Sequence, residues 1–196
     1  MKPGDIIQFG KYLQYYKDPT PIEWIVLEIN GNTATLITRN GVEIEPYHKA
    51  WCPVSWETCS LRAWLNDEFF QRAFSADEQD RMAEVTVPAH KNPHFLSDPG
   101  NDTRDKVFLL SAEEAKKYFK TDEERQCIPT RLAVLAGAWL SRAGTCVWWL
   151  RTPGESDMDA VKVGIDGSVQ LFGDRVNIKL SVRPAIVVRF DPSSMN

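Results

Sequence analysis

The stretch IEWIVLEINGNTATLIT, residues 22–38, places two runs of β-forming residues on either side of Asn30-Gly31. An Asn-Gly dipeptide takes the positive φ angles of a tight hairpin turn at little cost. The stretch therefore predicts an antiparallel hairpin. Asn40-Gly41 lies a few residues later between two further apolar segments. We expect the strands to continue across it as a small β-meander over residues 1–45.

Helical patterns occupy the middle of the chain. One set of apolar side chains is spaced so that its members share one face of a helix: Leu61, Trp64, Leu65 and Phe69. Two segments match the capping box, in which a serine and a glutamate three residues later bond each other's backbone amides, at residues 75–78 and 111–114. We expect a core-facing helix from the first pattern and short helices from the other two.

Strand patterns return in the last fifty residues. Asp166-Gly167 separates residues 161–165 from 168–171, which predicts a second hairpin. Apolar runs predict further strands over residues 146–151 and 183–190. Strands before and after a helical block are typical of an α+β fold rather than of alternating βαβ units. Without a linker in the sequence, we expect one domain, 1–196, with the meander packed on an α+β body over residues 46–190.

Composition excludes several classes of protein. The 196 residues are 43% hydrophobic and 26% charged, which is typical of a globular protein. The net charge of −4 and the lack of a long basic cluster argue against nucleic-acid binding. Apolar runs are too short to cross a bilayer, so no membrane insertion is expected. Residues 4–9 already have a strand pattern, which leaves no room for a signal peptide. We expect a cytoplasmic protein, or a secreted or cell-surface one if a leader precedes Met1.

Six segments, in order, resemble an uncharacterised bacterial domain family of unknown function that is common in anaerobic gut bacteria. They are GDIIQFGKY (4–12), PIEW (21–24), WETCSLRAWLN (56–66), DKVFLLS (105–111), WLRTPG (149–154) and VRPA (182–185). The C-terminal part, from the Trp-rich strand to the last strand, also resembles the C-type-lectin-like fold shared by formylglycine-generating enzymes and variable phage receptor-binding proteins. This resemblance implies short twisted strands, a few helices and irregular loops that form a binding face.

The chemistry of those relatives does not carry over to this chain. The tripeptides of calcium-dependent lectins, Glu-Pro-Asn, Gln-Pro-Asp and Trp-Asn-Asp, do not occur in the sequence. Formylglycine-generating enzymes use a closely spaced cysteine pair near the C-terminus, whereas the last cysteine here is Cys146 and its nearest partner is Cys127. We therefore expect neither calcium-dependent sugar binding nor the oxidase reaction.

The cysteines and histidines do not form a recognisable metal motif. Cys52, Cys59, Cys127 and Cys146 contain no C-x-x-C pair, so we expect free, buried thiols, although three disulfide pairings are open. His90 and His94 are four residues apart, so both could bind one metal ion if their segment were a helix. Pro88 and Pro93 break such a helix. We expect solvated loop histidines, no metal and no cofactor.

A catalytic site is the alternative to binding. The sequence has no G-x-S-x-G elbow and no phosphate-binding Gly-Lys-Ser/Thr. Cys52 lies close to His48 in sequence, which does not establish hydrogen-bond geometry. An enzyme would have to assemble its site from loop residues such as His48, His94 and Asp102. A structural or accessory domain without a concave site is the third class.

Arginines and tryptophans are divided between core and surface. Arg62, Arg151 and Arg183 lie in core-like segments, and we expect them to pair with carboxylates, for which Glu23 and Glu57 are the candidates. Most of the seven tryptophans are expected in the core. Trp51 is the best candidate for an exposed ring.

The sequence predicts a non-catalytic module that binds a glycan or a peptide or protein ligand. Its face is expected from three irregular segments, residues 47–51, 92–102 and 154–159, because loops on a rigid scaffold carry recognition. The candidate binding residues combine aromatic rings with polar groups: Tyr47, His48, Trp51, Asn92, His94, Phe95, Asn101 and Asp157. The identity of the ligand and the oligomeric state are not defined by the sequence.

Overall fold

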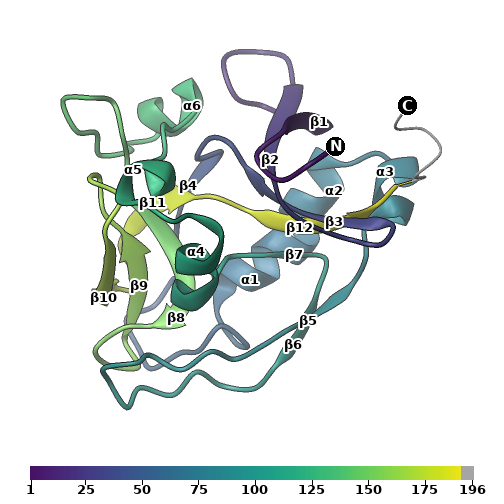
Figure 1. Cartoon of the computed structure of the whole chain (residues 1–196). Coiled ribbons are helices and arrows are strands. Elements are labelled where there is room, and N and C mark those ends of the chain that lie inside the picture. The colour runs from purple at the N-terminus through teal and green to yellow at the C-terminus, as the bar shows by residue number, and fades with distance from the viewer. Residues whose placement is uncertain (191–196) are drawn as a thin grey trace.

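Two five-stranded sheets form most of the protein, for which a computed structural model describes residues 1–190. In Figure 1 the first sheet lies to the right and the second to the left. The first sheet is antiparallel and has the order β1 (Ile6–Tyr12), β2 (Thr20–Asn30), β3 (Thr33–Thr38), β12 (Ala185–Arg189), β7 (Val107–Phe108).

The second sheet combines strands from the middle and the end of the chain. Its order is β10 (Val169–Arg175), β9 (Asp159–Val163), β8 (Trp148–Pro153), β11 (Lys179–Val182), β4 (Glu43–Pro46). The pair β8 and β11 is parallel and the other pairs are antiparallel. A separate two-stranded sheet joins β5 (Val85–Val87) to β6 (Thr103–Asp105), and the loop between these strands runs below the second sheet in Figure 1.

Short helices connect the strands. They are α1 (Ser60–Trp64), the π-helix η1 (Leu65–Phe69), α2 (Phe70–Ala73), α3 (Ala76–Arg81), α4 (Ala112–Tyr118), α5 (Asp122–Arg125) and α6 (Arg131–Leu135). The helix predicted from the apolar spacing is confirmed, because α1, η1 and α2 follow one another without a break. Both predicted capping boxes are present, at the start of α3 and of α4. The mixed α and β content agrees with the predicted fold class, and strands predominate.

Both predicted hairpins are confirmed. Gly31 has a φ of 60° between β2 and β3, and Gly167 has a φ of 86° between β9 and β10. At Gly167 the glycine is needed for space as well, since a Cβ atom there would lie 1.7 Å from the carbonyl oxygen of Asp122. A larger residue at this turn would clash with the start of α5.

The predicted meander over residues 1–45 is wrong at its last strand. β4 does not pair with β3 but with β11 in the other sheet, and β12 takes the place beside β3. The chain leaves the first sheet at Gly41, whose N–H donates to Ile128 O at 3.1 Å and whose carbonyl accepts from Thr130 N at 2.8 Å. Residue 45 is therefore not a boundary between a meander and a body, because strands from both ends of the chain complete each sheet.

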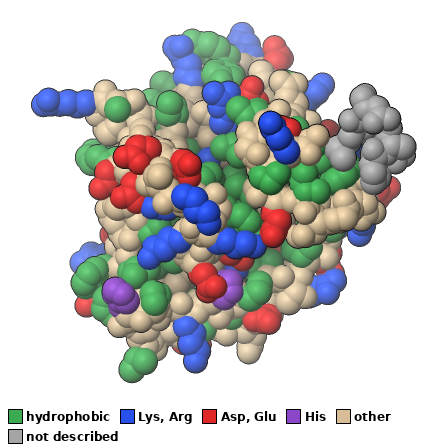
Figure 2. Space-filling model, viewed as in Figure 1, with side chains coloured by type: hydrophobic (Ala, Val, Ile, Leu, Met, Phe, Trp, Pro, Cys, Tyr) green, Lys and Arg blue, Asp and Glu red, His purple; other side chains and the backbone are tan. Residues whose placement is uncertain are grey.

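Tryptophans fill the core and have bonded indole groups. Trp24, Trp148 and Trp149 are fully buried, and their Nε1 atoms donate to the carbonyls of Phe9, Arg125 and Glu45. Such bonds satisfy the polar end of a large apolar side chain. Trp64 is only partly buried. Among residues 1–190, no helix has the length and apolar character to cross a membrane. Basic and acidic side chains are interspersed on the face of the molecule shown in Figure 2.

Candidate functional site

A polar pocket of about 370 Å³ lies where three loops meet. One loop precedes α1, the second joins β5 to β6, and the third joins β8 to β9. The lining is largely polar and consists of Pro53, Val54, Ser55, Glu57, Thr58, Asp98, Gly100, Asn101 and Asp157. Residues that are far apart in sequence thus form one concave surface.

Carboxylates and backbone amides hold the three loops together. Asp98 N donates to Asp157 Oδ1 at 2.7 Å, and Val54 N donates to the Asp157 carbonyl at 2.8 Å. The backbone and side-chain nitrogens of Asn101 both donate to Glu57 Oε2, at 3.1 and 3.0 Å. These contacts fix the pocket walls relative to one another before any ligand binds.

Position 100 requires glycine for two reasons, its backbone conformation and the lack of space for a side chain. Its φ is +73°, a region that other residues rarely adopt. A Cβ atom at this position would lie 2.4 Å from Ser55 Oγ and 3.3 Å from Glu57 Oε2. The glycine therefore lets the β5–β6 loop approach the loop before α1 closely.

Hydrogen-bond acceptors predominate in the pocket. Glu57, Asp98 and Asp157 line it, and no Lys, Arg or His is among the lining residues of the described chain. Among these described residues, each of the three carboxylates takes part in hydrogen bonds through one oxygen: Glu57 Oε2, Asp98 Oδ1 and Asp157 Oδ1. The second oxygen of each can accept from a ligand.

The structure brings together two of the three segments predicted for the binding face. Residues 92–102 and 154–159 contribute Asp98, Asn101 and Asp157, but the third wall comes from residues 53–58 instead of 47–51. Sequence reasoning missed Ser55, Glu57 and Thr58. Pro53 and Ser55, which are common in turns, were the local signal for a loop there.

Tyr47 and Asn92 are buried, so their expected place on an exposed face is corrected. Tyr47 is 2% exposed, its hydroxyl donates to the Arg151 carbonyl at 2.9 Å, and burial raises its pKa well above the usual value. The Asn92 amide donates to the carbonyls of Pro153 and Leu171, both at 2.8 Å. The Tyr47 hydroxyl joins the segment after β4 to β8, and the Asn92 amide joins the β5–β6 loop to β8 and β10, so neither presents its polar group to a ligand.

His48, His94 and Asp102 do not converge. His48 Nδ1 accepts from Ser60 N at 3.1 Å, and Asp102 Oδ1 accepts from Ala89 N at 2.8 Å. The His94 ring lies 6.4 Å from the ring of Phe95, centroid to centroid. None of the three lines the polar pocket. The loop-built catalytic constellation is thus not formed by these residues.

Two predicted aromatic residues lie near the outside of the second sheet. Trp51 is 55% exposed, and the Arg175 guanidinium lies 5.1 Å from its ring centroid. Phe95 packs against Phe172 with ring centroids 5.0 Å apart, and Phe172 is itself exposed. Trp51 precedes Pro53 by two residues, so its ring lies at the start of the loop that forms one pocket wall.

The three arginines are buried or half-buried, but their partners differ from those predicted. Arg62 Nε donates to Asp105 at 2.7 Å, and Arg151 pairs with Glu114. Arg183 has no carboxylate partner among the described residues. Glu23 instead forms an exposed pair with Arg39, and Glu57 bonds Asn101. The predicted partners were chosen for apolar surroundings in sequence, which do not determine distance in the fold.

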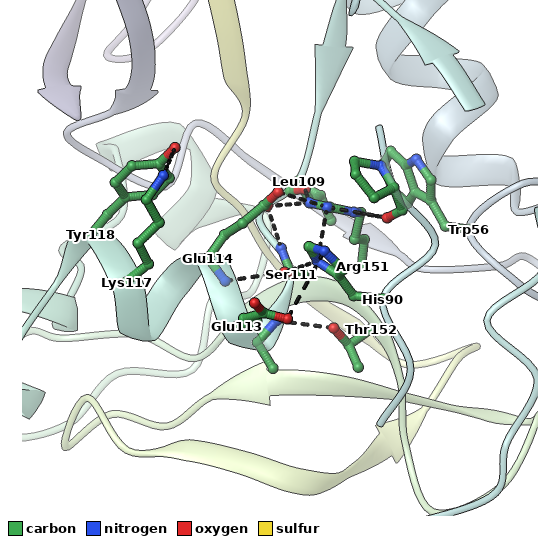
Figure 3. A network of polar contacts seen from close by, with 12 residues as sticks. Trp56, His90, Leu109, Ser111, Glu113, Glu114, Lys117, Tyr118, Arg151 and Thr152 are labelled. Atoms are coloured by element: carbon green, nitrogen blue, oxygen red, sulfur yellow. Dashed lines mark hydrogen bonds and ion pairs between the residues drawn. The ribbon is translucent and has the colours of Figure 1, made fainter. Parts of the chain in front are cut away.

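Arg151 is the centre of the polar network in Figure 3. Its guanidinium is bonded to Glu114 by both terminal nitrogens and also donates to the carbonyls of Leu109 and Pro88. Burial raises the pKa of Glu114, but the hydrogen bonds and charge of Arg151 outweigh burial, so the net pKa lies below the usual value. Because Pro88 begins the β5–β6 loop, this ion pair anchors one end of the loop that lines the pocket.

A histidine, a serine and a glutamate in the same network resemble a catalytic triad (Figure 3). His90 Nδ1 lies 2.7 Å from Ser111 Oγ, and His90 Nε2 lies 3.9 Å from Glu113 Oε2. Ser111 is 0% exposed, and its Oγ accepts from Glu114 N as the cap of α4. A substrate cannot reach this oxygen, so the arrangement is structural. The prediction of a solvated loop histidine is therefore wrong for His90, whose ring is bonded to Ser111.

Metal ligands are not clustered in residues 1–190. No group of three or more His, Cys, Asp or Glu side chains there is placed to hold a metal ion. The three carboxylates of the pocket thus do not form a preassembled metal site.

Comparison with known proteins identifies the family. The model of a domain of unknown function, DUF6273, matches residues 31–190. The chain belongs to the DUF6273 family. No curated protein and no solved structure matches it. The DUF6273 match includes every residue that lines the polar pocket, whereas β1 and β2 lie before it.

Proposed function

We propose that this DUF6273 domain is a non-catalytic binding module whose ligand occupies the polar pocket. The observation that carries the proposal is the convergence of three loops, joined by hydrogen bonds, around a cavity of about 370 Å³. Cavities of a few hundred Å³ hold small ligands or one unit of a larger one. Walls fixed before binding reduce the entropy lost when the ligand binds.

The lining favours a ligand that donates hydrogen bonds. Glu57, Asp98 and Asp157 each have an oxygen that accepts no bond from the described residues, and Ser55 and Thr58 add hydroxyl groups. Sugar hydroxyls donate well to carboxylates and need no opposite charge. An anionic ligand would be repelled by the three carboxylates. A neutral glycan therefore fits the pocket best.

A binding role fits this lining better than catalysis does. Nucleophilic and general acid–base sites usually contain His, Cys or Lys, and the lining holds none of them. The remaining route would be a pair of carboxylates that act as acid and base. That route is tested below by looking for product as well as for binding.

A cationic peptide side chain is the second candidate, because the pocket has three carboxylates and no basic residue among its lining. The two ligand classes differ in salt dependence. Binding of a lysine or arginine side chain at an open site weakens as salt screens the charges. Binding of a neutral glycan is nearly independent of salt.

We also propose that the fold is related to the C-type-lectin-like fold, as the resemblance of the C-terminal part implies. The proposal is supported by the short strands from β8 to β12 and by the irregular loops that form the pocket. An experimental structure superposed on such domains tests this proposal. A different strand order in the common sheet would contradict it.

The binding experiment uses the whole chain and a panel of neutral oligosaccharides, lysine-rich and arginine-rich peptides, and anionic oligosaccharides. Binding is measured by changes in amide NMR spectra and by calorimetry at low and high salt. We expect a neutral oligosaccharide to shift the amides of the three pocket loops. The same mixtures are analysed by mass spectrometry. A cleaved ligand would show that the protein is an enzyme and would reject the non-catalytic binding module.

The pocket variant combines Glu57→Gln with Asp157→Asn. Each amide keeps one oxygen that can accept the hydrogen bonds between the loops. We expect affinity to fall by about tenfold or more, equivalent to about 1.4 kcal/mol, because two charged acceptors are lost. The matched control is Asp77→Asn with Glu123→Gln, which removes the same charge from exposed positions outside the pocket. Equal affinity for both double variants would reject the pocket, and failure of every panel member to bind would reject the proposed function.

A further inference from the structure

Two cysteines and an arginine meet in the interior, away from the polar pocket. Cys127 and Cys146 are 2% and 1% exposed, and Cys146 N donates to the Cys127 carbonyl at 2.8 Å. Their thiols lie within hydrogen-bonding contact of each other. A backbone hydrogen bond places two residues as close as neighbours in a sheet, within the Cα separation of about 4.4–6.8 Å that a disulfide spans.

Arg183 lies beside both thiols and has no carboxylate to neutralise it. The side chain is 1% exposed, its Nε donates to the Thr38 carbonyl at 2.8 Å, and its Nη1 has no hydrogen-bond partner among the described residues. Its guanidinium lies 5.0 Å from the Trp148 ring and 5.1 Å from the Phe119 ring. Aromatic faces attract a cation but do not cancel its charge.

The two thiols are the acidic groups that act on Arg183 in the described chain. The hydrogen bond from Cys146 outweighs burial and, with the positive charge of Arg183, lowers the pKa of Cys127. The same hydrogen bond and burial raise the pKa of Cys146, which therefore keeps its proton. Cys127 Sγ donates to the backbone carbonyls of Ile128 at 3.7 Å and Arg39 at 3.9 Å, so the thiol form is hydrogen-bonded in the structure.

We propose that Cys127 and Cys146 are a redox-active pair: both are thiols in the reduced protein, and a disulfide joins the two sulfurs in the oxidised protein. The site is distinct from the ligand pocket and does not depend on the proposed function.

The oxidant is a small-molecule or protein disulfide. The Cys127 thiolate attacks one of its sulfurs, which forms a mixed disulfide and releases the other sulfur as a thiolate. Cys146 then loses its proton and attacks the Cys127 sulfur, which releases the second thiolate. Two electrons pass from the cysteine pair to the oxidant, and the new bond is the Cys127–Cys146 disulfide.

The other two cysteines serve as internal references. Cys59 is 2% exposed, and burial raises its pKa to about 12, so we expect no reaction in the folded protein. Cys52 is partly exposed, so we expect it to form mixed disulfides with the oxidant.

The first test equilibrates the full chain in mixtures of reduced and oxidised glutathione, followed by acid quenching, alkylation and peptide mass spectrometry. We expect a loss of about 2 Da and a cross-linked peptide that contains Cys127 and Cys146. Incubation continues until the ratio is constant, so slow opening of the buried site delays the result without changing it. Cys52→Ser is the control and should give the same cross-link. Absence of the cross-link under the most oxidising mixture overturns the redox pair.

The second test measures the thiolate by its ultraviolet absorbance between about pH 5 and about pH 9. We expect thiolate absorbance to rise near pH 7, because the pKa of Cys127 is lowered to about 7, and we expect this rise to be lost in Cys127→Ser and retained in Cys52→Ser. If Cys127→Ser does not fold, the rate of alkylation at each cysteine of the unchanged protein is followed against pH instead. No thiolate signal at Cys127 below about pH 9 overturns Cys127 as the attacking sulfur.

Discussion

Arg151 and Arg183 are both buried, but their charges are balanced in different ways. Arg151 bonds the Glu114 carboxylate and the carbonyls of Leu109 and Pro88. Arg183 has one hydrogen bond, two aromatic neighbours and two nearby thiols. Removing one partner of the Arg151 pair leaves a buried charge without its counter-ion, whereas removing Arg183 leaves no carboxylate unpaired. We therefore expect the fold to depend more strongly on Arg151 than on Arg183.

The largest expected effect comes from breaking the Arg151 pair. Glu114→Gln keeps the size of the side chain and the capping contact to Ser111 N, but leaves the Arg151 charge without a carboxylate. We expect the free energy of unfolding to fall by about 3 kcal/mol, as for other buried pairs that lose one partner. Urea denaturation measures it.

The matched control for that change is Glu23→Gln, which breaks the exposed pair with Arg39. We expect a loss of about 0.2–1 kcal/mol, because water and salt screen an exposed pair. Equal losses in the two variants would show that the Arg151 network does not stabilise the protein more than a surface pair.

The next effect is on pH dependence. The folded pKa of Glu114 lies below its usual value of 4.5, so the unfolded state binds more protons in acid. Its contribution to stability is present above about pH 4.5 and is lost as pH falls through the folded pKa. The difference in unfolding free energy between the unchanged protein and Glu114→Gln should stay constant from about pH 7 to about pH 5.5 and shrink below that. A constant difference down to the acid transition would contradict it.

A smaller loss is expected when Arg183 is removed. Arg183→Met fills similar space and eliminates an unpaired buried donor, and it leaves no carboxylate without its partner. We expect a loss below about 2 kcal/mol, compared with about 3–5 kcal/mol for Arg151→Met, which leaves Glu114 buried without a partner. Urea denaturation of the two variants side by side checks the order. If Arg183→Met is the less stable of the two, the comparison between the arginines is wrong.

The smallest effect is expected at an exposed tryptophan, whose loss gives a reference value for the stability changes at the two buried arginines. Trp51 is 55% exposed and its main contact is with Arg175, so Trp51→Ala should cost less than about 1 kcal/mol. Trp149→Ala, at a fully buried ring, should cost about 3–5 kcal/mol. Thermal melts of the two variants measure the contrast. A large drop in melting temperature for Trp51→Ala would place this ring in the core and remove it from the surface near the pocket.

Local structure could be predicted from the sequence wherever its cause lies within a few residues. Asn30-Gly31 and Asp166-Gly167 set hairpins because the turn conformation depends on those two residues. Ser75 and Ser111 begin helices because each bonds a group three residues away. The α+β fold class follows from the same local patterns.

Long-range partners could not be predicted in this way. Asn40-Gly41 has the same turn chemistry as Asn30-Gly31, yet Gly41 bonds Ile128 and Thr130, and β4 joins the other sheet. A turn signal fixes the backbone at the turn but not the strand that the next segment will meet.

The same division applies to the candidate site. The sequence by itself determined that residues 92–102 and 154–159 are irregular and polar, because Pro, Gly, Asn and Asp disfavour regular elements. Only the tertiary structure decided that the third wall is residues 53–58, that Tyr47 and Asn92 are buried, and that Arg151 meets Glu114 while Arg183 meets two thiols. These contacts join residues that are tens of positions apart, and their distances depend on how the two sheets pack rather than on any pattern within one segment.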